Sequence, residues 1–358
     1  MPTTAELETT QRIDPLEDPR WDEFLATHPR SSVFHSRPWL ESLRRTYGFR
    51  VHAYTTSLPG EKLSNAAVFC VVDSWLSGRR LVSLPFSDHC EWLVDDNADR
   101  ETLFSAIEVE YRREKFLYVE MRPTSRFQVP TALICSAEEL CLHQIDLRPD
   151  LATLFQNLHR GSTRRKIQRA ERENLAYEEG TSESLLESFW ELTILTRRRH
   201  GLPPQPRRWF RNLIDCFGES LKIMVAYSNN HAVASILVLR HKDSLIYKYG
   251  CSDAHFHNLG GMHLLLWRAI QGAKKMGLKV FDLGRSNIQN TGLILFKERW
   301  GAQRSPLTYL TFSPAGSVRG ASSHPDSDWR LRYARRIFTY APDSFLSLVG
   351  NALYKHIA

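Results

Sequence analysis

Three polar residues stand around the end of a predicted strand in the last third of the chain. The segment Lys279–Leu283 reads as a strand, and Gly284 permits a turn after it. Asp282, Arg285 and Ser286 then lie at the carboxyl end of that strand, where α/β sheets commonly bind ligands. An arginine there binds a carboxylate or phosphate through two parallel hydrogen bonds. An internal Asp282–Arg285 ion pair that fixes the loop accounts for the same pattern, so both interpretations stay open.

Lys297 lies in a short predicted helix, directly after Phe296 and shortly before Trp300 and Gly301. An unperturbed lysine has a pKa of about 10.4, so it is a cation at neutral pH unless desolvation or a neighbouring cation lowers that pKa. We expect an electrostatic role, in which the ammonium stabilises the oxyanion formed when an amine attacks an ester or thioester carbonyl. The alternative is a surface lysine paired with a carboxylate, which contributes less than about 1 kcal/mol.

Gly260 and Gly261 come directly before a predicted amphipathic helix, Met262–Met276. Glycines at this point let the backbone approach a ligand closely, and the free N–H groups of a helix N-terminus face an anion. A phosphate-bearing cofactor or donor is therefore one interpretation. The other is a strand-to-helix turn that needs a positive φ angle.

Two tyrosines and a basic segment are further candidates for substrate binding. Tyr247 and Tyr249 alternate along the predicted strand Leu245–Cys251, so the period of two places them on one face. Packing of that face against the following helix is equally compatible with their spacing. Arg164 and Arg165 begin a basic helical segment that could bind a phosphorylated substrate or tRNA, or be a solvated helix face.

The predicted elements follow the same order twice. Each half reads as two helices, three strands, a helix, a strand and a final strand, the last of these at Leu307–Phe312. A helix between strands late in each unit favours a mixed α/β sheet flanked by helices. We expect an N-terminal domain over residues 19–148, a catalytic domain over 149–314, and a linker with two C-terminal amphipathic helices over 315–358.

Bulk composition sets the class of protein. The chain has 358 residues, 42% hydrophobic and 24% charged, which suits two folded domains of an ordinary globular protein. It contains no apolar run long enough to span a membrane and no secretory signal at its start, so we expect a cytoplasmic protein. The net charge of +7 favours anionic partners such as nucleotide phosphates, tRNA or anionic lipid.

Neither cysteine nor histidine spacing predicts a metal centre. The six cysteines are scattered without a C-x-x-C pair, so buried reduced thiols are expected. His255 and His257 form an H-x-H without a third histidine or a carboxylate at ligand spacing, so we expect no metal. Four arginines between Trp329 and Tyr340 make a predicted C-terminal helix basic, and such a helix lies on anionic lipid or docks on the protein with its arginines outward.

Several motifs in their order resemble the Fem (FemABX) family of peptidyltransferases and, more broadly, the GNAT acyltransferase superfamily. The central one runs from Asn290 through G-L-x-x-F-K-x-x-W-G, and it follows Y-K-Y-G-C-S and F-D-L-G-R-S. Supporting matches are Arg164–Ala170 (R-R-K-I-Q-R-A), Val33–Leu40 and Leu81–Phe86, so the resemblance covers about residues 20–312.

The resemblance implies two tandem GNAT-like domains with the active cleft in the second. It implies that Lys297 lies in that cleft, that the tyrosine strand lines the acceptor site, and that the glycine pair corresponds to the coenzyme A loop of GNAT enzymes, although it lacks that loop's basic first residue and its second spaced glycine. It also implies an acyl-CoA or aminoacyl-tRNA donor and an acceptor of the cell envelope. The chain lacks the long helical hairpin that some members use for tRNA.

The leading hypothesis is an acyl- or aminoacyltransferase that forms an amide or ester on a cell-envelope or exopolysaccharide-related acceptor. Lys297 and Asp282 would be catalytic, and the acceptor would contact the tyrosines, the arginines and the Ser286 and Asn290 side chains. The second hypothesis is a non-catalytic accessory protein of envelope polysaccharide synthesis, held at the inner face of the membrane by its basic C-terminal helix. The partner would be a small or lipid-linked precursor, and the oligomeric state stays open.

Overall fold

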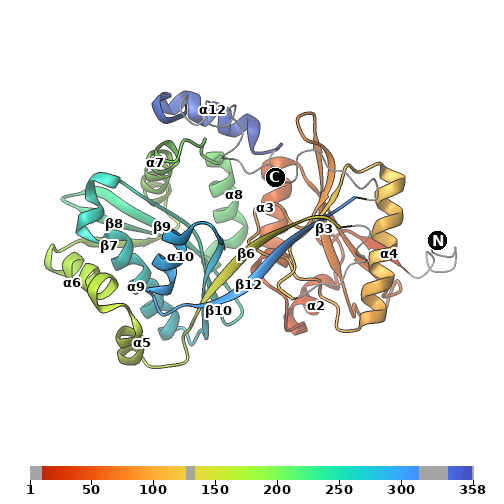
Figure 1. The fold of residues 1–358 in the computed structure, drawn as a ribbon, viewed down its shortest axis with the longest axis horizontal. Coiled ribbons are helices and arrows are strands. Elements are labelled where there is room, and N and C mark those ends of the chain that lie inside the picture. Colours follow the sequence, from red (N-terminus) through yellow and green to blue (C-terminus); the bar gives the residue numbers. More distant parts are fainter. Residues whose placement is uncertain (1–9, 126–133, 314–337, 357–358) are drawn as a thin grey trace. The chain divides into compact units, whose positions relative to one another are not determined.

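The computed structural model describes residues 10–125, 134–313 and 338–356 of the chain (Figure 1). Their contacts divide them into two compact units. Unit 1 contains the described residues up to 139 together with 307–313 and 353–356, and unit 2 contains 140–306 and 338–352. This division departs from chain order, whereas the predicted domains 19–148 and 149–314 follow it.

Unit 1 is a mixed sheet with helices packed on it. Its strands lie in the order β1-β2-β3-β4-β5-β12, and β4 runs parallel to β5 because helix α4 connects them. A buried core joins the sheet to α4 through residues such as Phe69, Leu103 and Phe312. The elements are β1 (Gln11–Ile13), α2 (Trp21–Thr27), α3 (Arg37–Tyr47), β2 (Arg50–Thr55), β3 (Ala67–Ser74), β4 (Gly78–Val82), α4 (Asn97–Glu114), β5 (Val119–Met121) and the second half of β12 (Gln303–Phe312).

Unit 2 repeats this plan at greater length. Its strands lie in the order β6-β11-β10-β9-β8-β7, with β10 parallel to β11 across the connecting helix α9. The elements are β6 (Ile134–Asp146), α5 (Leu151–Asn157), α6 (Arg165–Arg172), β7 (Ala176–Gly180), α7 (Glu183–Arg199), α8 (Arg207–Phe217), β8 (Leu221–Ser228), β9 (His231–His241), β10 (Ser244–Ser252), α9 (Gly261–Lys275), β11 (Val280–Asn287), α10 (Thr291–Glu298) and α12 (Asp343–Leu353).

The predicted repeat of element order is present in the strands and helices that precede the last strand of each half. β2-β3-β4-α4-β5 in unit 1 corresponds to β8-β9-β10-α9-β11 in unit 2. The last strands pair against chain order, because β6 follows β5 in the chain but pairs with β11, while β12 follows β11 but pairs with β5. Hydrogen bonding of a strand depends on spatial neighbours and not on position in the chain, so the repeated element order does not by itself predict these pairings.

The two faces of the unit 2 sheet are covered by different helices. Helix α9 packs on one face, where Leu265, Ile270 and Phe281 belong to the main core of the unit. Helices α7 and α8 pack on the other face, with Phe189 against Phe210. The strands β1 and β7 were not predicted, since both are edge strands whose side chains are half-buried or exposed and lack an apolar alternation.

Helix α12 docks on unit 2 through a glycine. A Cβ atom on Gly350 would clash with the backbone carbonyl of Pro204, so the helix approaches the segment after α7 more closely than any side chain permits. The second of the two predicted C-terminal helices is thereby confirmed in its main part as α12. The predicted basic helix Trp329–Tyr340 falls mostly outside the described residues.

Two glycine-to-alanine changes in helices should act in opposite directions. Gly350→Ala should release α12 and lower stability, because the added methyl group meets the carbonyl of Pro204. Gly272→Ala in α9 should raise stability by about 0.4–1 kcal/mol, because no atom lies within 4 Å of the added Cβ and the unfolded chain loses conformational freedom. Thermal unfolding, with hydrogen exchange of residues 343–353, measures both effects; equal shifts for the two variants would contradict this packing.

Candidate functional site

A β-bulge in β11 organises the polar residues predicted from the sequence. In the antiparallel pairing with β6, Asp282 lies opposite Gln144 and Arg285 lies opposite Leu142. Two residues of β11, Leu283 and Gly284, therefore face the single residue between those partners on β6, which defines a bulge. The strand does not end at Leu283 as predicted but continues to Asn287, because Gly284 adopts a φ of 71° that accommodates the extra residue within the ladder.

Asp282 and Lys297 hold the bulge from two sides. The Asp282 carboxylate accepts a hydrogen bond from the Gly284 amide at 2.6 Å and another from the Gln144 side chain at 3.2 Å. The Lys297 ammonium donates to the carbonyl oxygens of Gly284 at 2.8 Å and Arg285 at 2.9 Å. The lysine is only 3% exposed, so this short helix holds a cation buried against the bulge.

Helix α10 positions Lys297, and Asn290 begins that helix. The Asn290 side chain accepts a hydrogen bond from the Leu293 amide at 3.1 Å, as helix N-cap residues do. Asn290 was predicted to bind substrate, and its observed contact is this cap. Arg285 is exposed, whereas Ser286 on the next position of β11 is buried.

Two buried polar side chains beside the bulge have no hydrogen-bond partner in the described part of the chain. They are His143 on β6, with both ring nitrogens, and Ser286 on β11, with its hydroxyl. Cys141 pairs with Ser286, and His143 follows Cys141 by two residues, so the three share one face. A buried polar atom without a partner costs about 1–3 kcal/mol, and a ligand group that formed the missing hydrogen bonds would recover that free energy.

His143 was not singled out from the sequence. Burial, together with the positive charges of Lys297 and Arg304, lowers its pKa to about 4, so the ring is neutral at physiological pH. Its position within the apolar strand β6 is a usable signal in the sequence, because a polar side chain among apolar neighbours in a strand has to be satisfied or functional.

The two tyrosines of β10 do not share a face. The pairing of β10 with β9 shifts between Tyr247 and Tyr249, which inserts Lys248 as an extra residue. Tyr247 consequently packs on the α9 side, with its hydroxyl near the Met262 sulfur, while the Tyr249 hydroxyl accepts a hydrogen bond from the indole of Trp209 in α8 at 2.9 Å. The prediction of a common face is wrong, because a bulge adds one residue and reverses the alternation.

The parallel strands β10 and β11 separate beyond their first three residue pairs. The last pair is Ile246 with Asp282, after which β10 continues beside β9 and β11 continues beside β6. A hollow of about 260 Å³ lies near the carboxyl end of β10 and the N-terminus of α9. Its lining includes Ser252 from β10, Gly260 and Gly261 from the helix entry, and Phe296 from α10.

The glycine pair is required by close packing at the entry to α9. Gly260 has a φ of 83°, and a Cβ atom there would clash with the backbone carbonyl of Lys166 in α6. A Cβ on Gly261 would lie 3.2 Å from the side chains of Val233 and Ala234 in β9. Both the turn interpretation and the close-approach interpretation of the sequence are therefore compatible with the geometry.

The formal charge in the described lining of the hollow is positive and comes from Lys166. Lys166 lines it, and so do His257 and His263. Burial, and then the charge of Lys166, lower the pKa of His263 to about 3; burial, and then Arg199 and Lys166, lower the pKa of His257. The hollow thus combines a helix N-terminus, one ammonium and two neutral imidazoles, which suits a ligand with anionic and polar groups.

Arg164 and Arg165 differ in their surroundings. Arg164 donates to the backbone carbonyls of Leu158 and Gln156, and its guanidinium lies over the ring of Phe155. Those contacts hold the irregular turn between α5 and α6. Arg165 is exposed at the start of α6. Neither arginine lines the hollow, whereas their neighbour Lys166 does.

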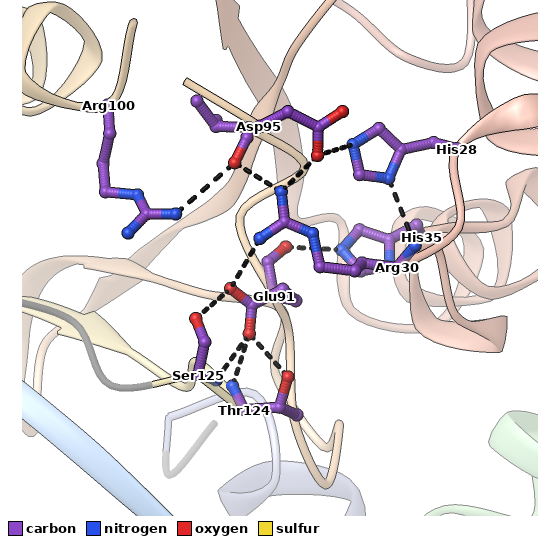
Figure 2. A network of polar contacts seen from close by, with 9 residues as sticks. His28, Arg30, His35, Glu91, Asp95, Arg100, Thr124 and Ser125 are labelled. Atoms are coloured by element: carbon purple, nitrogen blue, oxygen red, sulfur yellow. Dashed lines mark hydrogen bonds and ion pairs between the residues drawn. The ribbon is translucent and has the colours of Figure 1, made fainter. Parts of the chain in front are cut away.

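A second polar network occupies unit 1 (Figure 2). The buried Glu91 carboxylate accepts hydrogen bonds from the amides and hydroxyls of Thr124 and Ser125, at 2.5–2.8 Å. These bonds hold the pKa of Glu91 below its usual range despite its burial. Arg30 lies between this carboxylate and Asp95. Because the Glu91 oxygens are engaged, this cluster is a structural clamp between loops.

Among the described residues, no cluster of three or more histidine, cysteine, aspartate or glutamate side chains has the geometry to hold a metal ion. None of the described helices is both long and apolar enough to cross a bilayer.

Comparison with known proteins defines the class. Residues 158–291 match the family model of the GNAT acetyltransferase domain. No curated protein matches the chain significantly. Among solved structures, the crystal structure of FemX is similar with a TM-score of 0.63 and 14% identity, over 84% of this chain and 96% of that chain.

Two other solved structures share the fold. One is the C-terminal domain of an Agrobacterium fabrum protein named for lysylphosphatidylglycerol synthetase, with a TM-score of 0.53 and 15% identity over 84% of this chain and 92% of that chain. The other is a tandem GNAT protein from the clavulanic acid biosynthesis pathway, with a TM-score of 0.51 and 10% identity over 84% of this chain and 97% of that chain. At these identities the likeness concerns the fold.

The class of the protein follows from the domain match and the fold together. Unit 2 contains a GNAT acetyltransferase domain over residues 158–291, as expected of an acyltransferase, and the chain shares its fold with FemX and with a tandem GNAT protein. The resemblance inferred from the sequence motifs is thereby confirmed at the level of fold and class.

Replacing His263 with phenylalanine should make the protein less sensitive to acid. The pKa of His263 is depressed to about 3, so below about pH 6.5 this histidine takes up a proton in the unfolded chain but not in the native state. The free energy of unfolding therefore decreases as the pH is lowered through that range. At pH 5 this linkage costs about 2 kcal/mol. The variant keeps ring contacts with Phe296 and Trp300.

The measurement compares urea unfolding at pH 7.5 and pH 5. The wild-type chain should lose more stability over this step than His263→Phe, and the exposed His255→Gln variant should behave as the wild type does. An equal loss in His263→Phe would contradict the burial of a neutral imidazole at this position.

Proposed function

We propose that unit 2 transfers an acyl or aminoacyl group from an activated ester or thioester to an amine or hydroxyl group, by direct attack on the carbonyl. The observation that carries this proposal is the separation of β10 from β11 next to the hollow at the N-terminus of α9. Strands that separate in this way open a slot at their carboxyl ends, where α/β folds bind ligands. The Lys297 cation on α10 and the orphaned His143 on β6 and Ser286 on β11 lie beside that slot.

The donor that fits best is an acyl-CoA. Its phosphates would meet the free amides of the α9 N-terminus and the Lys166 ammonium, and a helix N-terminus favours an anion by about 0.3–1 kcal/mol. A hollow of about 260 Å³ accommodates the slender pantetheine arm of an acyl-CoA but not the body of a nucleic acid. Aminoacyl-tRNA is the other donor, for which the exposed Arg165 on α6 would supply a phosphate contact.

The chemistry requires little proton transfer from the protein. When the acceptor nitrogen or oxygen attacks, its new bond to carbon forms as the carbonyl electrons move to oxygen; collapse expels the thiolate or alkoxide, which takes up the acceptor's proton. Lys297 would stabilise the oxyanion by its charge, and one such interaction contributes about 2.7–4 kcal/mol to lowering the barrier. Asp282 would hold the bulge, so that β11 presents its polar residues at a fixed place.

His143 and Ser286 would bind the acceptor. A neutral imidazole both donates and accepts a hydrogen bond, and the serine hydroxyl does the same, so the pair suits an amine or hydroxyl group that must be held uncharged before attack. Holding the acceptor against the carbonyl supplies much of the acceleration, since fixed orientation replaces a bimolecular encounter.

A cell-envelope or exopolysaccharide-related molecule is the acceptor class we propose. FemX and the lysylphosphatidylglycerol synthetase domain share the fold, and the second is named for a lipid product. A lipid-linked or small polar precursor with a free amine or hydroxyl is compatible with the polar face of β6 and β11.

A non-catalytic role is the alternative, and one observation favours it. The hydrogen bonds from the Lys297 ammonium to the carbonyls of Gly284 and Arg285 belong to the bulge. A lysine retained only for these bonds would serve the fold, and the tandem domain would then act as an accessory protein of envelope polysaccharide synthesis.

Titration calorimetry with coenzyme A and acetyl-CoA tests the donor. Lys166→Ala should weaken binding about tenfold, since losing one hydrogen bond to a charged group costs about 1.5 kcal/mol or more. Lys275→Ala is the control, because it removes the same charge from the exposed far end of α9. No binding of either compound, together with retention of aminoacyl-tRNA on filters, would instead support the tRNA donor.

Turnover of Lys297 variants separates the catalytic role from the structural one. Thiol release from an acyl-CoA panel with amine acceptors should fall about 100-fold or more in Lys297→Met, which keeps the length of the side chain but not its charge. Lys297→Arg should retain part of the activity. Circular dichroism at the assay temperature establishes that each variant is folded, and a folded Lys297→Met with wild-type turnover would leave the lysine a purely structural role.

A further inference from the structure

The turn between β3 and β4 in unit 1 exposes an unusual pair of apolar side chains. Trp75 is 82% exposed and Leu76 is 53% exposed. Leu117 is 48% exposed and adjoins them, since a Cβ atom on the neighbouring Gly78 would lie 3.3 Å from its side chain. By contrast, the other tryptophans of the described ranges are at most 8% exposed. Exposing a tryptophan and two adjacent leucines to water is unfavourable in free energy. A role of these side chains in binding would explain why they are exposed.

This turn is held in place by the end of the chain. The Trp75 indole N–H donates to the ring of His356 at 3.1 Å, and the two rings meet edge to face. Ser77 donates its hydroxyl to the carbonyl of His356 at 2.7 Å, and Arg80 donates to the same carbonyl at 3.0 Å. The polar atom of the indole is therefore satisfied by the protein, while the apolar part of the ring faces outward.

The charges next to the turn leave a positive surplus. The carboxylate of Asp73 pairs with Arg50 and Arg79, and that of Glu114 pairs with Arg79 and Arg113. Lys115, two residues before Leu117, and Lys355, next to His356, are both exposed. The apolar side chains therefore lie among cations whose acidic neighbours are already neutralised.

Size and composition decide between a protein and a lipid partner. One aromatic and two leucine side chains fall well short of the roughly 800 Å² per partner that a stable protein interface buries. Lysine is also depleted from the centres of such interfaces. In a membrane interface the same features are favourable, since tryptophan resides at the level of the headgroups and nearby lysines are attracted to an anionic leaflet.

We propose that Trp75 and Leu76, with Leu117, form a peripheral attachment point for an anionic lipid bilayer, and that Lys115 and Lys355 contact its headgroups. This proposal is independent of acyl transfer, because it concerns only unit 1 and an interaction that needs no donor. It differs from the expected attachment through the arginine-rich segment at Trp329–Tyr340, which lies mostly outside the described residues.

Tryptophan fluorescence of the full chain tests the attachment directly. A Trp329→Phe background removes the tryptophan outside the described residues, so that quenching by brominated phosphatidylcholine reports mainly on Trp75. Vesicles of phosphatidylglycerol and brominated phosphatidylcholine should quench the emission, and Trp75→Phe should abolish most of that change. Unchanged quenching in Trp75→Phe would overturn the proposal.

Sedimentation with phosphatidylglycerol-containing vesicles measures affinity. Trp75→Ser combined with Leu76→Ser should reduce binding about tenfold or more, since removing two apolar side chains from the interface costs at least about 1.4 kcal/mol. Lys115→Ala combined with Lys355→Ala should weaken binding and reduce its dependence on salt. Leu58→Ser is the matched control, because Leu58 is also in unit 1 and is 49% exposed.

Three outcomes would contradict the proposal. Equal binding to vesicles of phosphatidylcholine alone would overturn the requirement for anionic lipid. Loss of binding in Phe345→Ser combined with Leu348→Ser, with the Trp75 variant unaffected, would place the contact on α12, whose outer face exposes those residues. If the wild-type chain bound neither kind of vesicle, attachment to a bilayer would be refuted, and the partner of the turn would be a protein.

Discussion

The bulge at Leu283–Gly284 depends on one carboxylate and one ammonium. Asp282 accepts the Gly284 amide and Lys297 donates to the carbonyls of Gly284 and Arg285. A bulge disrupts the ladder locally, so its backbone groups need other partners, and a buried polar group without one costs about 1–3 kcal/mol. The two charged side chains supply those partners, and in doing so they draw α10 onto β11 and fix the position of a buried cation.

The same bulge explains the arrangement of the neighbouring polar residues. Because it adds one residue to β11, Ser286 is buried opposite Cys141 while Arg285 is exposed. His143 on β6 lies across from the added residue and shares its face with Cys141. A similar shift at Lys248 in β10 turns Tyr247 and Tyr249 to different faces. Two bulges thus decide which side chains surround the slot between β10 and β11.

At the other side of the slot, close packing of backbone sets the geometry. Gly260 permits α6 to approach until the Lys166 carbonyl lies against it, and Gly261 permits α9 to approach β9. This brings the Lys166 side chain to the hollow, although that lysine is almost a hundred residues away in the chain. The motif R-R-K therefore contributes its third residue to the hollow, whereas its first, Arg164, holds the turn before α6.

The sequence by itself determined the α/β class, most helices and strands, and the class of acyltransferase, because these depend on local periodicity, on caps and on the order of short motifs. It also marked Asp282, Lys297 and the glycine pair. Only the tertiary structure decided that β6 and β12 pair against chain order, that β11 continues through a bulge, and that His143, Lys166 and His263 lie beside these residues. The physical reason is that strand pairing, bulges and burial are set by contacts between segments distant in the chain, which no local pattern encodes.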